Sequence, residues 1–555
     1  TPAERVMINE RVCEGCGDCG RKSNCLSVQP VPTEFGRKTQ IDQSSCNLDF
    51  SCLDGDCPSF LTVIGGKPGN GSGAARQIAP PLDTAAIPAP HSPEHKAAAG
   101  PHVTRITGVG GTGVVTLSQI LSTAALLAGR QVKALDQTGL AQKGGAVVSD
   151  VKIADTELQL AGKAAAGECD LYLGCDILVA ADPKNLAAAD RDRTVAVVST
   201  TEVPTGAMVI DTSASFPDSG EITERIRLRS RAADAVFLDA RRLAETLLGE
   251  DQFANILLTG AAFQAGALPL PAEAIEKAIT LNGVRVDANL QAFRRGRQAV
   301  ADPAAFAATL AALEPPSPAA PEPAGATAVA SVVAAADGSE LARIVALRTA
   351  DLIGYQDAGY ARRYAEQVER VRRAEAERVP GGGELAEAVA RYLYKLMAYK
   401  DEYEVARLSL DPAVAANVRS RFGAGARMSY RLHPPVLRAL GARKKLTLGP
   451  WFRPVFGVLV RMRRLRGTRL DPFGYTSVRR TERELIAEYA RLIGDLLATL
   501  SPGNHALAVQ LASLPDEVRG YEQVKLDNVT RYRERLAELR TAYARQAEPV
   551  KDSRS

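Results

Sequence analysis

The sequence lacks the features of several common protein classes. It has no run of about 20 apolar residues, the length that a membrane-spanning helix needs, and its longest candidate, around Val455 to Val460, is flanked by Arg453 and Arg461. A basic region followed by an apolar run and a cleavage site is also absent, which argues against secretion. The 68 basic and 64 acidic side chains give a formal charge of only +4, so composition does not indicate a nucleic-acid partner. We therefore expect a cytoplasmic protein that does not enter a membrane.

Composition divides the chain into predicted domains. Its 555 residues are too many for one hydrophobic core, because domains commonly contain about 100–200 residues. Two segments rich in Gly, Pro and Ala, residues 65–101 and 314–340, are poor core formers and are predicted to be linkers. The remaining segments are the predicted domains: residues 1–64, an α/β domain at 102–313, and a mostly α-helical domain at 341–548.

Periodicity supports this division. Between the linkers, helical stretches alternate with apolar runs typical of strands, which are VTRITGVG, VAVVST, AMVID and AVFLDA. Beyond the second linker nearly every segment predicts helix. One apolar stripe there repeats at intervals of three and four residues, at Leu385, Val389, Leu393 and Leu396. No internal repeat is found.

Cysteines are few, yet seven of the nine fall between positions 13 and 57. The run CEGCGDC places three thiols on one tight loop, and its small residues let backbone N–H groups approach inorganic sulfides. In two-cluster ferredoxins each motif lends its last cysteine to the other cluster, so Cys57, which precedes a proline, completes the first loop. The predicted ligands of the first iron–sulfur cluster are Cys13, Cys16, Cys19 and Cys57.

The second cysteine motif is irregular. Cys46 and Cys52 are six residues apart, and a regular motif would have its middle cysteine where Asp49 stands. A carboxylate can ligate iron, or a three-iron cluster forms if it does not. We therefore predict Cys25, Cys46 and Cys52, with Asp49 as a possible fourth ligand, around a second cluster that is 4Fe–4S or 3Fe–4S.

Two other interpretations of the cysteines fit the sequence less well. A disulfide framework requires a secreted protein, and a zinc site does not need seven cysteines at these spacings. Iron–sulfur clusters instead imply a reducing, intracellular compartment. Cys169 and Cys175 lie in an apolar, strand-like setting and are interpreted as packing residues.

A glycine-rich segment opens the predicted α/β domain. HVTRITGVGGTGVVTLSQIL indicates a strand, a turn and a helix, an arrangement that presents backbone amides to an anion such as a phosphate. The glycines of this turn are Gly108, Gly110, Gly111 and Gly113. A dinucleotide site would require an acidic residue further on, but Asp136 belongs to a segment that resembles a second anion-facing loop, at Lys143, Gly144 and Gly145. Glycines that serve only packing in a tight turn are an equally good interpretation.

These motifs together resemble those of the 2-oxoacid:ferredoxin oxidoreductases, most closely the large fused indolepyruvate type. The resemblance rests on the cysteine segment, on GVGGTGVVTLSQIL with DQTGLAQKGG, and on LPLPAEAIEKAITLNGVRVDANLQAFRRGR. It extends through LYKLMAYKDEYEVARL and DPFGYTSVRRTERELI, and so covers nearly the whole chain. It implies a ferredoxin-like iron–sulfur module, a Rossmann-like gamma domain and a C-terminal helical domain.

The resemblance also implies an activity: oxidative decarboxylation of a 2-oxoacid to an acyl-coenzyme A, with single electrons leaving through 4Fe–4S clusters to ferredoxin. Its gamma domain is expected near the active site, where the glycine turn would hold the phosphates of coenzyme A. The sequence has no G-D-G motif followed by an Asn-rich segment for Mg²⁺ and thiamine diphosphate. Both are therefore expected in a preceding part of a longer chain or in a partner subunit of an oligomer, and this segment alone should be inactive.

Two other functions remain open at this point. The glycine turn could bind NAD(P)H in a ferredoxin-linked reductase, although no flavin site is evident, or the chain could be an iron–sulfur carrier or scaffold. The basic segment VRMRRLRGTR, at 460–469, is either a docking surface for an acidic ferredoxin or an ordinary solvated helix face or subunit contact. His433 and His505 show no metal-ligand spacing.

Overall fold

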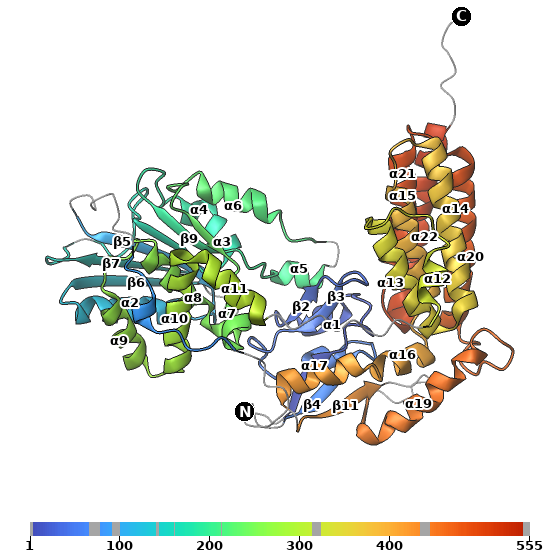
Figure 1. Ribbon diagram of the computed structural model, residues 1–555, viewed down its shortest axis with the longest axis horizontal. Coiled ribbons are helices and arrows are strands. Elements are labelled where there is room, and N and C mark those ends of the chain that lie inside the picture. Colours follow the sequence, from blue (N-terminus) through green and yellow to red (C-terminus); the bar gives the residue numbers. More distant parts are fainter. Residues whose placement is uncertain are drawn as a thin grey trace, which may run out of the picture.

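The computed structural model describes nine stretches of the chain, at residues 4–65, 78–90, 100–139, 144–159, 161–211, 214–313, 324–423, 425–432 and 445–547. They form a small N-terminal module, an α/β domain on one side of it and a bundle of long helices on the other (Figure 1). No helix in these stretches is both long and apolar enough to cross a bilayer.

The N-terminal module is built of short elements around its cysteines. They are β1 (Glu4–Ile8), α1 (Asp18–Ser23), β2 (Val28–Val31), β3 (Lys38–Ile41), the 3₁₀ turn η1 (Ser51–Asp54) and β4 (Phe60–Ile64). β1 pairs antiparallel with β4, and β2 with β3. Apolar side chains of these strands, including Val6, Ile8 and Phe60, pack around the cysteines.

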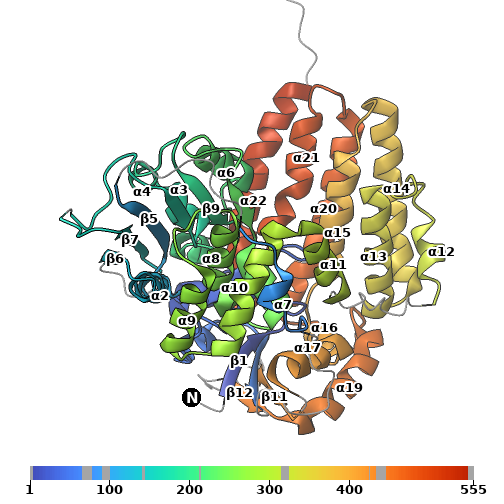
Figure 2. The ribbon, with the colours of Figure 1, turned by 60° about the vertical axis from the view of Figure 1, so that its left-hand side comes forward.

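Two strands from the C-terminal region complete the sheet of this module. β11 (Arg427–Leu432) pairs antiparallel with β4 and β12 (Leu446–Leu448) pairs with β11, which gives the order β1-β4-β11-β12 (Figure 2). These strands lie within the segment that was expected to be mostly α-helical. The physical reason is an alternation of period two, in which Met428 and Tyr430 are buried and their neighbours are not. Tyr430 packs on the ring of Phe456 at 4.8 Å between centroids.

The α/β domain has a six-stranded sheet in the order β10-β9-β8-β5-β7-β6. Four strands are parallel, and β6 and β7 form an antiparallel hairpin at one edge. The strands are β5 (His102–Val109), β6 (Gln131–Thr138), β7 (Ala146–Ala154), β8 (Leu171–Gly174), β9 (Val195–Ser199) and β10 (Val236–Leu238). The sheet order reverses at β5, which runs into the glycine turn. In open α/β sheets such a point is a usual place for a ligand.

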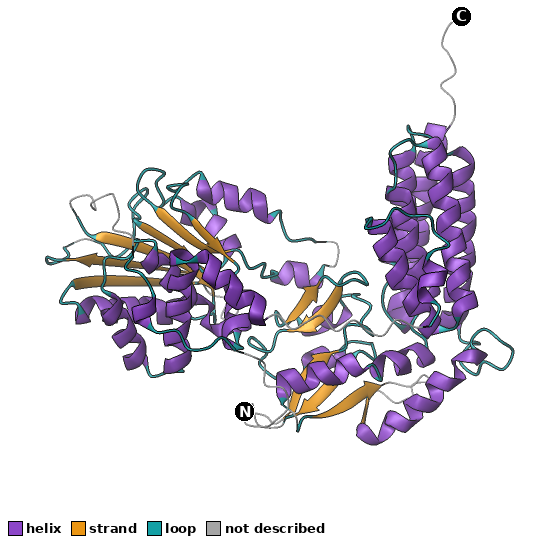
Figure 3. Ribbon diagram, in the orientation of Figure 1, coloured by secondary structure: helices purple, strands orange, loops and turns teal. Residues whose placement is uncertain are grey.

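The helices of this domain cover its sheet, apart from α5, which contacts α1 and β2 of the N-terminal module (Figure 3). They are α2 (Val114–Leu127), α3 (Ile177–Ala181), α4 (Pro183–Leu186), α5 (Gly206–Ile210), α6 (Ser219–Arg227), α7 (Ala240–Leu248), α8 (Ala254–Gln264), α9 (Ala272–Asn282), α10 (Val286–Ala301) and α11 (Pro303–Leu313). Helix α8 is buried along its whole length. It crosses α10 closely at Gly260, which has no side chain; a Cβ there would lie 2.0 Å from the Phe293 oxygen.

Three of the four predicted strand runs are strands, but AMVID is not. That segment forms helix α5, whose start is capped by the Thr205 side chain. Its Val209 is buried against the cysteine module rather than in the sheet. Periodicity alone does not distinguish a short buried strand from a single helical turn.

The described parts of both predicted linkers contact neighbouring domains. Residues 78–90 lie along the α/β domain, where Ala79 N–H donates to the Leu247 oxygen at 2.8 Å and Gln264 donates to the Pro88 oxygen at 3.0 Å. In the second linker, α12 (Ala326–Ala330) buries Val329 in the core of the helical bundle.

The C-terminal region is otherwise helical. Its elements are α13 (Glu340–Tyr355), α14 (Ala358–Arg378), α15 (Glu384–Met397), α16 (Glu402–Ser409), α17 (Pro412–Phe422), α19 (Arg453–Met462), α20 (Ser477–Thr499), α21 (His505–Ser513) and α22 (Glu522–Ala547). The predicted apolar stripe of α15 is confirmed, since all four of its residues are buried. Helices α16, α17 and α19 lie below the bundle, beside the strands of the N-terminal module (Figure 1).

Candidate metal centres

The four cysteines predicted for the first cluster converge. Gly15 and Gly17, at φ 64° and 75°, turn the loop that carries Cys13, Cys16 and Cys19 into α1. The loop of Cys57 is held against α1 because the Asp18 carboxylate accepts the Asp56 N–H at 2.7 Å. Burial, together with the neighbouring thiols Cys57 and Cys13, raises the pKa of Cys16 to about 12.

The second predicted set also converges. Burial, together with three nearby acidic groups, raises the pKa of Cys52 to about 12; these groups are Cys46, Cys25 and Asp49. Asp49 stands between Leu48 and Phe50, both in the left-handed region at φ 61°. Its exposed carboxylate accepts hydrogen bonds from the Ser51 N–H at 3.0 Å and from Asn47 at 3.1 Å. The aspartate is therefore near the thiols and held in place by its sequence neighbours.

The donor chemistry of these sites suits a multinuclear cluster. All nine cysteines are free thiols. Four sulfurs on one zinc ion would lie about 3.8 Å apart, given a Zn–S distance of about 2.3 Å. Among the described residues, the only group of three His, Cys, Asp or Glu side chains whose ligand atoms all lie within 4.8 Å of one another is Glu375, Glu384 and His505, which is not in either cysteine set. Burial therefore makes ionisation of these thiols unfavourable unless a metal binds them as thiolates. Their sulfur atoms are also further apart than the ligands of a single zinc ion. Both features fit an iron–sulfur cluster.

The group around Glu375 has a structural explanation. Its buried carboxylate accepts the N–H groups of Leu385 and Ala386 at 2.9 and 2.8 Å, which satisfies the start of α15. His505 lies 2.7 Å from the same carboxylate.

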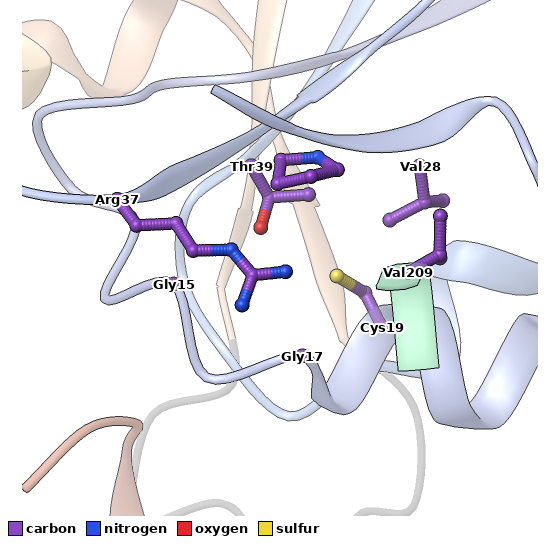
Figure 4. Close-up of a pocket in the computed structure, with 8 residues that line it drawn as sticks. Gly15, Gly17, Cys19, Val28, Arg37, Thr39 and Val209 are labelled. Carbon is purple, nitrogen blue, oxygen red and sulfur yellow. The ribbon is translucent and has the colours of Figure 1, made fainter. Parts of the chain in front are cut away.

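A small cavity adjoins the first set. It is lined by Gly15, Gly17, Cys19, Val28, Pro30, Arg37, Thr39 and Val209. The Arg37 guanidinium extends toward this space from one side and the Cys19 sulfur lies on the other (Figure 4). Arg37 donates to the Met208 oxygen of α5 at 2.9 Å, so the α/β domain helps to fix it. Burial and the nearby Arg519 lower the pKa of Arg37.

The predicted glycine turn joins β5 to α2. Gly108 is a packing glycine, because a Cβ there would lie 2.6 Å from the Val114 side chain. Gly111 and Gly113 have φ of 87° and 91°, and Gly111 is open to solvent with no atom near its missing Cβ. Helix α2 starts at Val114 without a capping side chain. The turn thus combines packing with an open helix N-terminus.

The two glycine loops predicted to face an anion lie side by side. Gly110 N–H donates to the Gly145 oxygen at 2.7 Å, at the end of the ladder that pairs β5 with β7. Lys143 lies outside the described residues. Gly144, at φ 77°, contacts the N-terminal module, where a Cβ would come within 2.1 Å of the Leu26 side chain. Leu26 follows Cys25, so this loop lies against the second cysteine set.

Several contacting residues could not be identified from the sequence. Arg241 of α7 pairs with Asp42 of the cysteine module at 3.0 Å and also bonds Asp251. In the basic segment at 460–469, Arg466 is buried and bonds Asp401 at 2.5 and 2.8 Å, so it is structural and not part of a docking surface. Arg466 and Asp401 are 65 residues apart and Arg241 and Asp42 are 199 residues apart, so no local pattern indicates these two pairs.

Cys169 and Cys175 behave as packing residues. Cys169 is fully buried and its thiol donates to the Leu171 oxygen at 2.8 Å. Burial raises the pKa of each thiol to about 12. This agrees with the interpretation from the sequence.

Comparison with known proteins identifies the α/β domain. Residues 103–299 match the family model described as pyruvate ferredoxin/flavodoxin oxidoreductase, and residues 341–538 match a family of unknown function, DUF6537. The chain is 29% identical over 196 residues to the indolepyruvate oxidoreductase subunit IorB of Archaeoglobus fulgidus, covering 34% of this chain and 91% of the relative. The same subunit of Pyrococcus horikoshii is 29% identical over 197 residues, covering 35% and 93%.

The chain is also similar to solved structures of oxidoreductase subunits. The pyruvate oxidoreductase subunit PORC of Thermotoga maritima is 22% identical and covers 36% of this chain and 96% of its own, at a TM-score of 0.27. The gamma subunit of a keto/oxoacid ferredoxin oxidoreductase from Geobacter sulfurreducens is 22% identical and covers 36% and 98%, at 0.25.

The α/β domain is thus of the class found in oxidoreductase subunits. Residues 103–299 are therefore similar to the 2-oxoacid:ferredoxin oxidoreductase family, which confirms the resemblance inferred from the sequence.

Proposed function

We propose that this chain is the electron-transfer and coenzyme A-binding portion of a thiamine diphosphate-dependent 2-oxoacid:ferredoxin oxidoreductase in the cytoplasm. The observation that carries the proposal is the convergence of two cysteine sets beside the glycine loops of a domain from this family. An aryl pyruvate such as indolepyruvate is the proposed substrate, because the curated relatives are named as indolepyruvate oxidoreductase subunits.

The two cysteine sets have separate tasks in this proposal. Iron–sulfur clusters supply one-electron carriers when they are bound. Cys25 and its set are supported by the α/β domain through Leu26 and Gly144, and so lie toward the proposed coenzyme site. The two sets are neighbours, since Cys52 of the second acts electrostatically on Cys19 of the first. Single electrons can therefore pass between them and on to ferredoxin.

The glycine loops are proposed to hold the phosphates of coenzyme A. The N–H groups at the start of α2 have no capping side chain, and a helix N-terminus attracts anions through its unpaired N–H groups and its dipole. The open position of Gly111 lets a phosphate approach the backbone. Gly110 is not available for this task, because its N–H is already bonded to Gly145.

Thiamine diphosphate and Mg²⁺ are assigned to a partner portion, in the same polypeptide or in another subunit of an oligomer. The carbon chemistry belongs to that portion, and the present chain orients the coenzyme and conducts electrons.

The first test is the metal content of the full chain. Anaerobic purification or reconstitution should give a brown protein with about eight iron atoms, or about seven if the second cluster has three, with matching sulfide. Electron paramagnetic resonance of the reduced protein should reveal two interacting centres. A folded but iron-free protein after reconstitution contradicts the proposal.

The second test is activity in the assembled system. Addition of a thiamine-binding partner, indolepyruvate and coenzyme A should reduce ferredoxin and form an acyl-coenzyme A, whereas the chain alone should do neither. Bleaching of the cluster absorbance by NAD(P)H in the absence of that partner would instead support the reductase alternative.

A further inference from the structure

The C-terminal region holds the backbone of the first cysteine loop at three consecutive carbonyls. Tyr521 donates to the Val12 oxygen at 2.6 Å, Lys400 to the Cys13 oxygen at 2.9 Å, and Arg519 to the Glu14 oxygen at 3.2 Å. All three donors lie within residues 341–538, the segment that matches a family of unknown function. A contact this regular fixes the loop that presents three thiols.

The same region covers the loop with apolar atoms. Val405, Leu408 and Tyr521 form a buried cluster with Val12, and Cys57 packs against it. Gly520, at φ 102°, passes so close that a Cβ on it would lie 3.3 Å from the Cys16 Cβ. A Cβ there would also lie 2.7 Å from the Val524 side chain, so both the positive φ and the space favour glycine at this position. The first cysteine set is therefore shielded on this side by residues far away in sequence.

Charge near the first set is not evenly balanced. Lys400 is paired with Glu14 at 2.8 Å and Arg519 with Asp516 at 2.6 Å, so each of these cations has an anionic partner. Lys445 differs, because its ammonium donates to the Gly55 oxygen, two residues before Cys57, and lies 4.8 Å from the Phe60 ring centroid. Burial raises the pKa of Cys57, and Lys445 is the group that most opposes the rise.

The second set has a different electrostatic surrounding. Acidic groups act on Cys52, namely Cys46, Cys25 and Asp49, and acidic groups also act on Cys16 and Cys19 of the first set. The difference between the two sets is the ammonium of Lys445 near Cys57. A cluster ligated by four thiolates becomes more negative when it takes up an electron, so burial without a cation makes reduction harder. A cation beside one ligand opposes that effect.

We propose that the C-terminal region of unknown function is the cover and redox-tuning element of the first cluster, and that Lys445 makes this cluster easier to reduce by placing a positive charge beside Cys57. The inference rests on the proposed function in one respect, namely that an iron–sulfur cluster occupies the first set. Tyr521, Lys400 and Arg519 position the ligand loop, and Lys445 sets the potential.

Redox titration of the full chain, monitored by electron paramagnetic resonance, tests the charge. We expect Lys445→Gln to lower the equilibrium constant for one-electron reduction of the first cluster about tenfold. This corresponds to a reduction potential that is ~59 mV more negative. Lys445→Arg keeps the charge and should stay close to the wild type. Lys277→Gln, on the exposed face of α9, is the matched control and should change nothing. The first cluster is identified as the signal that persists in Cys46→Ala.

Iron release to a chelator tests the cover independently. Tyr521→Phe keeps the ring but loses the bond to the Val12 oxygen, so the first cluster should lose iron several-fold faster while the second is unchanged. Equal potentials of Lys445→Gln and the wild type would overturn the tuning role, and equal release rates would overturn the cover. A wild-type chain that binds no iron would instead refute the proposed function itself, which separates the two failures.

Discussion

The two cysteine sets have the same thiol chemistry but opposite surroundings. The first lies under the C-terminal region, with Cys13 and Cys19 buried and three carbonyls of its loop bonded by Tyr521, Lys400 and Arg519. In the second, Cys52 is buried and Cys25 and Cys46 are half-buried, and the loop carries the exposed Asp49. It contacts the α/β domain through Leu26. Ligand identity alone therefore does not set the properties of a cluster. The α/β domain reaches both sets, through Val209 and through Leu26, whereas the C-terminal region bonds the loop of the first set and changes its shielding and local charge.

Removal of one ligand from each set is expected to have the largest effect. Cys19→Ala leaves three thiolates in the first set, so the first cluster should lose its fourth iron, or all four of about eight in the chain if it no longer assembles. Cys46→Ala should remove the second cluster and leave the first intact. Iron analysis with spectroscopy checks both. Loss of both clusters from either single variant would show that the two sites are not independent.

The next largest effect is expected from the buried Arg466–Asp401 ion pair, which lies on the side of the first cysteine set. Arg466→Met leaves the Asp401 carboxylate buried without its partner beside Lys400, and should cost about 3–5 kcal/mol of unfolding free energy. We expect the first cluster to be lost at lower urea than the second. Arg461→Met, at an exposed position of α19, is the control and should be near neutral. Simultaneous loss of both clusters at unchanged stability would contradict the comparison.

A smaller effect is expected at Gly144, on the side of the second set. Gly144→Ala adds a Cβ that meets Leu26 at φ 77° and should cost about 1–3 kcal/mol, with a perturbed spectrum of the second cluster only. Gly111→Ala has a similar φ of 87° but meets no atom, so it measures the backbone cost alone.

Leu26→Ala in the same chain should recover the part of the loss that comes from the clash. Urea unfolding of the single and double variants measures this coupling. Equal losses for Gly144→Ala and Gly111→Ala, with no recovery, would mean that the contact with Leu26 contributes nothing.

Asp49→Cys is expected to have the smallest effect on stability but a clear spectroscopic result. The side chain is exposed and its bonds to Ser51 and Asn47 are local. A thiolate there should convert an oxygen-ligated or three-iron centre into an ordinary 4Fe–4S cluster, seen by electron paramagnetic resonance and iron counting. An unchanged spectrum would remove Asp49 from the ligands.

Local patterns predicted much of this architecture. The grouping of cysteines into two sets, the turn from β5 into α2 and the stripe on α15 are all encoded within a few tens of residues, where spacing and periodicity carry the information. The predicted strand at AMVID was wrong because the apolar pattern of five residues does not distinguish one helical turn from a short strand. The strand at 427–432 was missed because a helical setting outweighed its alternation of Met428 and Tyr430.

The contacts that distinguish the two sets could not be predicted. Tyr521 and Val12 are separated by 509 residues and Lys400 and Cys13 by 387, and each contact depends on how whole domains pack. A lone lysine or tyrosine in a helical region carries no signal of such a partner. The charge beside Cys57 is therefore a property of the tertiary structure and not of any motif.

The shared sheet has a consequence for how this protein is made. Strand β4 gains its second neighbour only from β11, so a ribosome must extend the chain from Ile64 to Leu448 before that sheet closes. At about 5–20 residues per second this takes roughly 20 to 80 s. During this interval the nascent chain presents an unpaired strand edge and an unshielded set of thiols, so iron insertion and release from the ribosome must be timed to each other.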